Sequence, residues 1–207
     1  MGIEEISRIL ALKISSRISL KSEEREIIEY GLKVFLSEVL SLSILFIVLF
    51  VAGLIKTGMS ILIPAGMLRK FSGGAHCSSP MCCTILGVMT VPLFAFSVER
   101  LLILGENKLL AAAVCLNVLS FFNCLKYAPA DSPQKPINEV SKKRLKRGAL
   151  LLILIAFSVL IAGYLLRYID ISFLLAASVG FFYQSITLTP AGYGFTASMD
   201  RLMRKII

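Results

Sequence analysis

The chain has 207 residues, of which 57% are apolar and only 17% are charged, and its mean hydropathy is +0.82. Globular soluble proteins carry roughly 45–50% apolar and about 25% charged residues, so the composition argues against a soluble domain and predicts a polytopic membrane protein. The net charge of +9 does not indicate nucleic acid as a partner, because most charges lie between apolar segments and no nucleic-acid-binding motif is present.

The first 33 residues are predicted to form an amphipathic segment. Apolar residues recur there at intervals of three and four, which places them on one face of a helix: Ile3, Ile6, Leu10, Ile14 and Ile18. Such a helix lies on the inner leaflet, binds a partner helix or packs against its own protein, and the sequence does not choose among these. A second helix is expected to start at Ser22 and to continue into the first membrane span.

Five apolar segments have the roughly 17–25 residues that a membrane-spanning helix needs. A sixth segment, residues 54–68, is shorter and contains Lys56 and Pro64, which leaves a short span, a kinked span or a re-entrant hairpin open. The five clear segments cover residues 34–52, 82–98, 109–125, 149–166 and 171–188.

The positions of Lys and Arg favour counting the sixth segment as a span. With six spans, 18 of the 22 basic residues fall on the side of both termini, as expected for cytoplasmic segments. We therefore expect an all-α integral membrane protein with cytoplasmic termini and one transmembrane domain, residues 34–190. Its cytoplasmic parts would include a loop at 69–83, a basic loop at 126–148 and a tail at 191–207.

The segment from Arg69 to Cys83 concentrates the reactive side chains. It holds His76, the chain's single histidine, and three of the five cysteines. A cysteine nucleophile needs a base for its proton and an acid for the leaving group, and an imidazole supplies both near neutral pH. In a straight helix residues 76 and 83 would be about 10.5 Å apart, so the chain must bend between them.

A Ser-Pro pair provides this bend. Pro80 fits the first position of a new helix with Ser79 as its N-cap, which places Cys82 and Cys83 in the opening turn, where free amides stabilise a thiolate. Gly73 and Gly74 allow close backbone approach to a substrate, and amides of that turn are candidates for an oxyanion site.

Several alternatives remain open from the residues alone. Either Cys82 or Cys83 can be the nucleophile. A zinc site formed by His76, Cys77 and the cysteine pair is disfavoured, because adjacent ligands at both ends make a poor tetrahedral clamp, and no metal or other cofactor is expected. Ser72, Ser78 and Glu38 are candidates to orient the imidazole, without support from a motif.

Three stretches together resemble the AgrB family, the accessory gene regulator membrane peptidases of Gram-positive bacteria. They are the Arg69-to-Cys83 block with Gly-Gly-Ala-His and a cysteine seven positions later, Glu29-Tyr30-Gly31, and the proline-rich Ala128-to-Ile137. The resemblance covers most of the chain. It implies a cysteine endopeptidase of the cell membrane whose site, on the cytoplasmic side, trims a short amphipathic precursor peptide, AgrD, for quorum sensing.

The resemblance also assigns roles to residues. It implies that His76 is the base and Cys83 the nucleophile, that a peptidyl thioester forms on Cys83, and that an internal Cys or Ser of the peptide closes a thiolactone or lactone ring. Arg69 is a candidate for binding a precursor carboxylate. The basic cluster that includes Lys142, Lys143 and Arg144 either contacts anionic lipid or attracts an acidic precursor tail. A homodimer is a further expectation.

The alternative function is that of a transporter or channel component for a small peptide or solute. In that case the cysteines would be packing residues and His76 a gating or substrate contact. Residues that bind a transported substrate are expected near the middle of the membrane, whereas residues 76 and 83 lie at a predicted span end.

Overall fold

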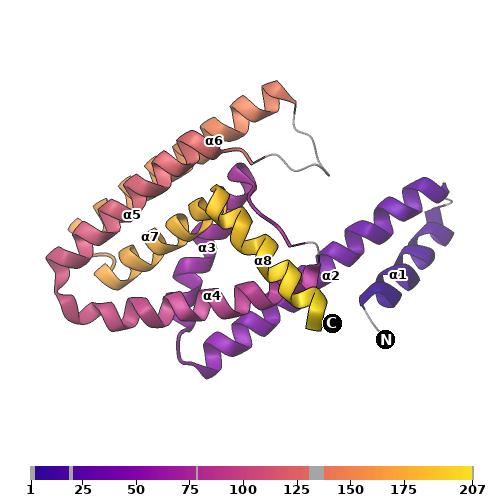
Figure 1. Cartoon of the computed structure of the whole chain (residues 1–207), viewed down its shortest axis with the longest axis horizontal. Coiled ribbons are helices and arrows are strands. Elements are labelled where there is room, and N and C mark those ends of the chain that lie inside the picture. The colour runs from indigo at the N-terminus through magenta and orange to yellow at the C-terminus, as the bar shows by residue number, and fades with distance from the viewer. Residues whose placement is uncertain (1–2, 19–20, 78, 131–137, 207) are drawn as a thin grey trace.

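The computed structural model describes residues 3–18, 21–77, 79–130 and 138–206, and within these ranges every regular element is helical. Figure 1 shows a bundle with a helical hairpin, α1–α2, extending from one side. The helices are α1 (Ile3–Ile18), α2 (Ser22–Val51), α3 (Ile55–Ser72), α4 (Pro80–Leu101), η1 (Leu102–Leu104), α5 (Glu106–Tyr127), α6 (Glu139–Leu165), α7 (Ile171–Ile186) and α8 (Pro190–Ile206).

One end of the bundle, here called the site end, brings together the loops that follow α3, α5 and α7. The amide of Ala130, after α5, donates to the carbonyl of Ser72 at 2.8 Å, and the amide of Ala75, after α3, donates to the carbonyl of Thr187 at 3.0 Å. Helices α3, α5 and α7 therefore all point toward the site end.

The opposite end, here called the far end, joins the other loops. Lys56 at the start of α3 pairs with Asp170 before α7 at 3.5 Å. Tyr164 near the end of α6 donates to Glu106 at the start of α5 at 3.1 Å. The helices from α2 to α7 thus run alternately between two ends, which is the arrangement that six membrane crossings require.

Within the described residues, four helices are long and apolar enough to cross a membrane by themselves: α2, and the helical stretches Met81–Leu104, Glu106–Tyr127 and Ser141–Leu165. A fifth candidate is α7 taken together with α8, which is bent from it by 79°. The predicted multi-pass membrane protein is confirmed at this level, whereas the count of six spans and the orientation of the termini stay predictions.

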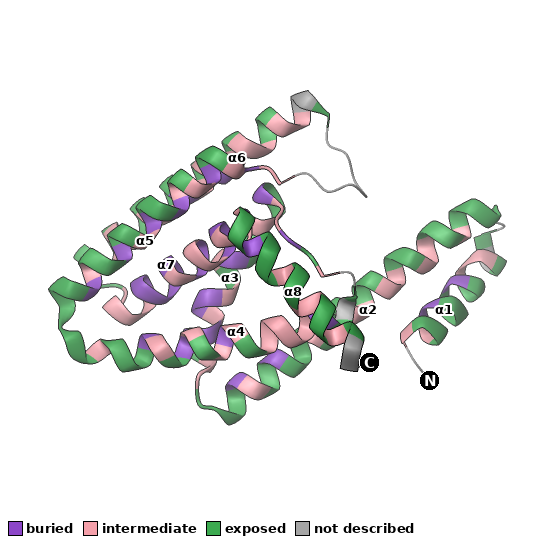
Figure 2. Cartoon of the chain, in the orientation of Figure 1, coloured by how far each residue is buried: buried purple, intermediate pink, exposed green. Residues whose placement is uncertain are grey.

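Helix α3 lies inside the bundle, where it packs against α7 most extensively and also against α4 and α6. Ile61, Leu174 and Leu175 are almost completely buried in the core between them, and Figure 2 shows buried residues gathered on α3 and α7. Gly180 permits this contact, because a Cβ atom there would overlap the carbonyl of Ile61. Another side of α3 is exposed, as the 53% exposure of Ile63 shows, so other helices enclose α3 only in part.

Residues 55–68 belong to the continuous helix α3, which passes through Pro64, and Leu54 is its N-cap. The re-entrant hairpin considered for this segment is therefore wrong. Helix α2 also runs without a break from Ser22, as predicted, and at about 1.5 Å per residue its 30 residues are about 45 Å long.

Helix α1 has the predicted bounds and packs against α2. The residues that it buries most are Ser7 and Ala11, while Leu10 and Ile18 of the expected apolar face are 37% and 63% exposed. An ion pair between Glu4 and Lys33 adds to the contact with α2. The hydrogen bond from Lys33, and then its positive charge, lower the pKa of Glu4. Part of the apolar face therefore remains open.

The basic cluster at residues 142–147 lies in the first turns of α6 rather than in a loop, because α6 begins at Glu139 with Asn138 as its N-cap. The expected cytoplasmic tail is mostly the helix α8. Residues 131–137 of the proline-rich stretch lie outside the described residues.

Candidate functional site

The α3–α4 loop begins at two glycines with positive φ angles. Helix α3 ends where Gly73, at φ +67°, donates to the carbonyl of Arg69 at 2.9 Å, and Gly74 follows at φ +139°. A Cβ atom on Gly73 would lie 2.8 Å from the carbonyl oxygen of Ala130, and one on Gly74 would lie 2.5 Å from Oγ1 of Thr187. The two glycines therefore let this loop pack against the loops that follow α5 and α7.

Helix α4 starts as the Ser-Pro pair predicts. Ser79 is the N-cap, and its Oγ accepts a hydrogen bond from the amide of Cys82 at 3.2 Å. Pro80 is the first helical residue. Cys82 and Cys83 consequently lie at the amino-terminal end of α4, as expected.

The bend brings Cys83 back to the residue that follows His76. The amide of Cys77 donates to Sγ of Cys83 at 3.4 Å, within the range for a hydrogen bond to sulfur. The sulfur of Cys83 therefore accepts a backbone hydrogen bond at the amino-terminal end of α4. Cys83, in the first turn of α4, thus contacts the residue that follows His76 in the α3–α4 loop.

Arg69, in the last turn of α3, faces the imidazole of His76. Its Nη2 lies 3.0 Å from Nδ1 and 3.2 Å from Nε2 of that ring, and it also donates to the carbonyl of Ala75 at 3.0 Å. A guanidinium only donates and a neutral imidazole has one unprotonated nitrogen, so that nitrogen is the one that can accept from Arg69. Desolvation by the surrounding protein, and then the positive charge of Arg69, lower the pKa of His76 and favour the neutral ring.

Gln184, on the last turn of α7, was not predicted as a site residue. It is 1% exposed, and its Nε2 donates to the carbonyl of Gly73 at 2.7 Å and to Oγ of Ser72 at 3.2 Å. Its Oε1 accepts from Nη1 of Arg69 at 3.3 Å. One carboxamide therefore holds both the glycine turn and the guanidinium; its only signal in the sequence is an amide within an apolar segment.

A second cluster lies beside this turn. The sulfur atoms of Cys77 and Cys82 and a carboxylate oxygen of Asp200, from α8, lie within 4.8 Å of one another. Desolvation, a hydrogen bond with Cys82 and the nearby Cys83 raise the pKa of Cys77. This is the group of described residues best suited to hold a metal ion, and it differs from the set considered from the sequence, which included His76 and Cys83.

The remaining described candidates lie on α6, on α2 and next to the glycine turn. Helix α6 crosses the end of α3 at Gly148, where a Cβ atom would lie 2.6 Å from the ring of Phe71. The basic cluster precedes this crossing by about one turn, and Lys143 and Arg144 are exposed. Glu38 is exposed on α2, and Ser78 lies outside the described residues. Ser72 contacts Gln184.

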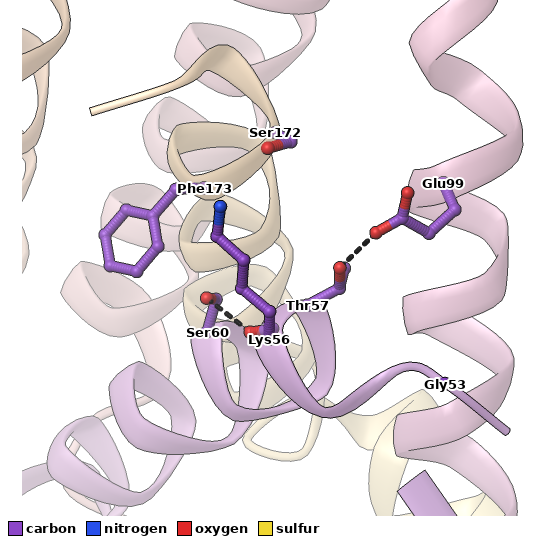
Figure 3. A pocket seen from close by; sticks show the side chains of 7 residues that line it. All are labelled: Gly53, Lys56, Thr57, Ser60, Glu99, Ser172 and Phe173. Carbon is purple, nitrogen blue, oxygen red and sulfur yellow. Dashed lines mark hydrogen bonds between the residues drawn. The ribbon is translucent and has the colours of Figure 1, made fainter. Parts of the chain in front are cut away.

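A polar pocket of about 340 Å³ lies at the far end (Figure 3). Its lining includes Lys56 and Thr57 of α3 and Glu99 of α4, and Thr57 donates a hydrogen bond to Glu99. Lys56 precedes Arg69 by 13 residues, which in a helix is about 20 Å. The pocket is therefore separate from the His76 and Cys83 turn.

Comparison with known proteins gives one consistent family. The family model for accessory gene regulator B matches residues 7–188. An AgrB-like protein of Clostridium perfringens strain SM101 is 30% identical over 213 residues, which cover 99% of this chain and all of the relative. An AgrB-like protein of Listeria innocua is 26% identical over 80% of this chain and 77% of the relative. No solved structure shows significant similarity.

Proposed function

The chain belongs to the accessory gene regulator B family, and from this premise we propose that it is a membrane cysteine endopeptidase that cleaves an AgrD-like precursor peptide. The observation that carries the proposal is the hydrogen bond from the Cys77 amide to Sγ of Cys83, one residue after His76. This contact lies between the proposed nucleophile and the residue that follows the proposed base. Of the two adjacent cysteines, Cys83 is the one whose sulfur meets this amide.

In the proposed reaction the sulfur of Cys83 attacks a peptide carbonyl of the precursor. His76 accepts the thiol proton and then gives it to the departing amine, so the carboxyl-terminal fragment leaves as a free amine and the peptide remains as a thioester on Cys83. The amides at the start of α4 and in the glycine turn are candidate donors to the oxyanion.

The contact between Arg69 and His76 implies that the substrate binds before the proton of Cys83 is transferred. The guanidinium occupies a lone pair of the His76 ring, so that ring cannot accept a proton while the contact persists. A carboxylate of the precursor is a stronger partner for Arg69 than a neutral imidazole. We propose that substrate binding releases the ring, which then turns toward Cys83.

The thioester retains an activated carbonyl for ring closure. A Cys or Ser side chain of the bound peptide attacks this carbonyl and forms a thiolactone or a lactone. The bond to the sulfur of Cys83 breaks, and that sulfur takes the proton of the attacking group to become a free thiol again. Hydrolysis would give a linear peptide instead, so water must be excluded from the site.

Two surfaces near the site end match the chemistry expected of an amphipathic precursor with an acidic tail. The open apolar residues of α1, Leu10 and Ile18, offer a face for the apolar side of a peptide helix. The exposed Lys143 and Arg144, with Lys142 beside them, offer positive charge for the tail. We place this end of the bundle in the cytoplasm, and the predicted homodimer remains a proposal.

The far-end pocket is the feature that would favour the alternative, a transporter or channel component. It lies at one end of α3 and the His76 turn lies at the other, whereas a substrate site of a transporter is expected near the membrane centre. The position of the pocket at one end of α3 therefore favours the peptidase proposal over the transporter alternative.

The test uses purified full-length protein in lipid vesicles and the precursor peptide encoded beside its gene, with the fragments identified by mass spectrometry. The wild type, Cys82→Ala and Cys115→Ser are expected to release the carboxyl-terminal fragment, while Cys83→Ala and His76→Ala are not. Cys115 is a matched control because it is exposed on α5. Equal cleavage by all five proteins would contradict the proposal.

A further inference from the structure

We propose that Cys77, Cys82 and Asp200 form a binding site for a thiophilic divalent cation such as Zn²⁺. The three residues come from three separate elements: the α3–α4 loop, the first turn of α4 and the helix α8. Their ligand atoms converge within 4.8 Å. Thiolate and carboxylate are ligands that zinc takes in proteins, and three protein ligands leave a fourth position for water.

The distances fit after a small contraction. With Zn–S bonds of about 2.3 Å and Zn–O bonds of about 2.0–2.2 Å, ligand atoms in a tetrahedral site lie roughly 3.5–3.8 Å apart. Cys82 is fixed, being 1% exposed at the capped start of α4. Cys77 lies in an irregular segment and Asp200 on the separate helix α8, so these two can move the remaining distance.

The charges also balance. Binding removes a proton from each thiol, so two thiolates and one carboxylate carry three negative charges against the two positive charges of the ion. Arg204, one turn along α8, lies 3.6 Å from the carboxylate of Asp200 and supplies the last positive charge.

The location gives the ion a structural role. Cys77 supplies the amide that contacts Sγ of Cys83, so fixing Cys77 fixes that donor. The same ion would join α8 to the loop, although α8 otherwise makes few contacts, mainly with α4. Neither His76 nor Cys83 is a ligand, so the ion leaves the reacting groups unoccupied.

The test is Co²⁺ and Zn²⁺ binding to the reduced, purified full-length protein in detergent, without any peptide. The wild type is expected to bind one ion per chain and to show the absorption of sulfur-to-cobalt charge transfer. Cys77→Ser, Cys82→Ser and Asp200→Asn are each expected to weaken binding by at least about 100-fold, since loss of a direct ligand exceeds the 10–100-fold effect of an outer partner. Cys115→Ser and Cys83→Ala are expected to bind as the wild type does.

Zn²⁺ is also expected to slow hydrogen exchange of the α3–α4 loop and of α8 in the wild type but not in Asp200→Asn. An absent charge-transfer band, binding that survives all three ligand substitutions, or binding lost in Cys83→Ala would overturn the inference. Because Cys83→Ala lacks the proposed nucleophile and no peptide is present, this result is independent of whether the peptidase proposal holds.

Discussion

At the scale of single residues, the site depends on a buried carboxamide. Gln184 satisfies the carbonyl of Gly73 and the Oγ of Ser72 while it holds the guanidinium of Arg69. A buried polar group that loses its partner costs about 1–3 kcal/mol. The position of the loop that carries His76 therefore depends on a residue 111 positions away from Gly73.

We predict that Gln184→Ala lowers precursor cleavage by about 100-fold, the loss that a misplacement of about 1 Å can cause. The substitution should also lower the free energy of unfolding by about 1–3 kcal/mol. Asn123→Ala is the control, since Asn123 donates to Ser185 near the same end of α7 without touching the α3–α4 loop. Equal cleavage by the two variants would remove Gln184 from the account.

The glycine turn gives a second prediction. Gly74→Ala places a Cβ atom 2.5 Å from Oγ1 of Thr187 at a φ of +139°, so we expect loss of cleavage and a lower melting temperature. Gly66→Ala, on the exposed side of α3, meets no atom within 4 Å and should stabilise the helix by roughly 0.5–1 kcal/mol. Thermal unfolding of the two variants should therefore move in opposite directions.

The part of the site that could be predicted is the part formed by residues close to His76 in the sequence. The Ser79 cap, the bend after His76 and the place of Cys83 follow from adjacent residues, and the structure agrees. Gln184 and Asp200 reach the site only because α7 and α8 fold back over it, and no local pattern contains that information. The same limit explains why the metal set considered from neighbouring residues differed from the cluster that the structure forms.

At the scale of helices, α1 shows how far amphipathic periodicity can be used. The spacing of Ile3 to Ile18 correctly gave the helix, but not its packed face, because the small side chains of Ser7 and Ala11 allow the closest approach to α2. Similarly, the charges at 142–147 suggested a loop, although Lys and Arg are good helix formers and Asn138 caps the helix before them.

The contact of α1 with α2 is predicted to weaken in acid. Because Lys33 lowers the pKa of Glu4 in the folded protein, the contribution of this pair is present above the ordinary pKa of a Glu carboxyl, 4.5, and is lost as pH falls through the lower pKa of the folded protein. Spin labels at Ser16 and Glu26 should report more separated helices at low pH, and Glu4→Gln should be separated to the same extent at all pH values. The effect should be small, since the pair is exposed.

At the scale of the whole molecule, helices α2 to α7 run alternately between the far end and the site end, and this gives the six-span prediction a specific topology. The loops after α3, α5 and α7 share the site end, so a membrane that is crossed by α2 to α7 places the turn with His76 and the basic start of α6 on the same side. Helix α3 packs against α7, α4 and α6 along part of its surface, and its membrane crossing stays a prediction.

Cysteine labelling tests this arrangement. In a variant whose native cysteines are replaced, single cysteines at exposed Lys143 and exposed Glu26 are expected to react with a membrane-impermeant maleimide only in inside-out vesicles, and one at exposed Tyr168 only in intact cells. If positions 26 and 143 were labelled from opposite sides, α3 would not cross the membrane.

The most direct test of the central claim, that Cys83 forms a thioester with the precursor, is to look for the covalent species itself. Wild-type protein is mixed with precursor, quenched in acid, digested and analysed by mass spectrometry. The account predicts a peptide acyl group on the fragment that contains Cys83, removed by neutral hydroxylamine, present in Cys82→Ala and absent in Cys83→Ala. Cleaved precursor with the acyl group on Cys82, or with no adduct under any quench time, would contradict it.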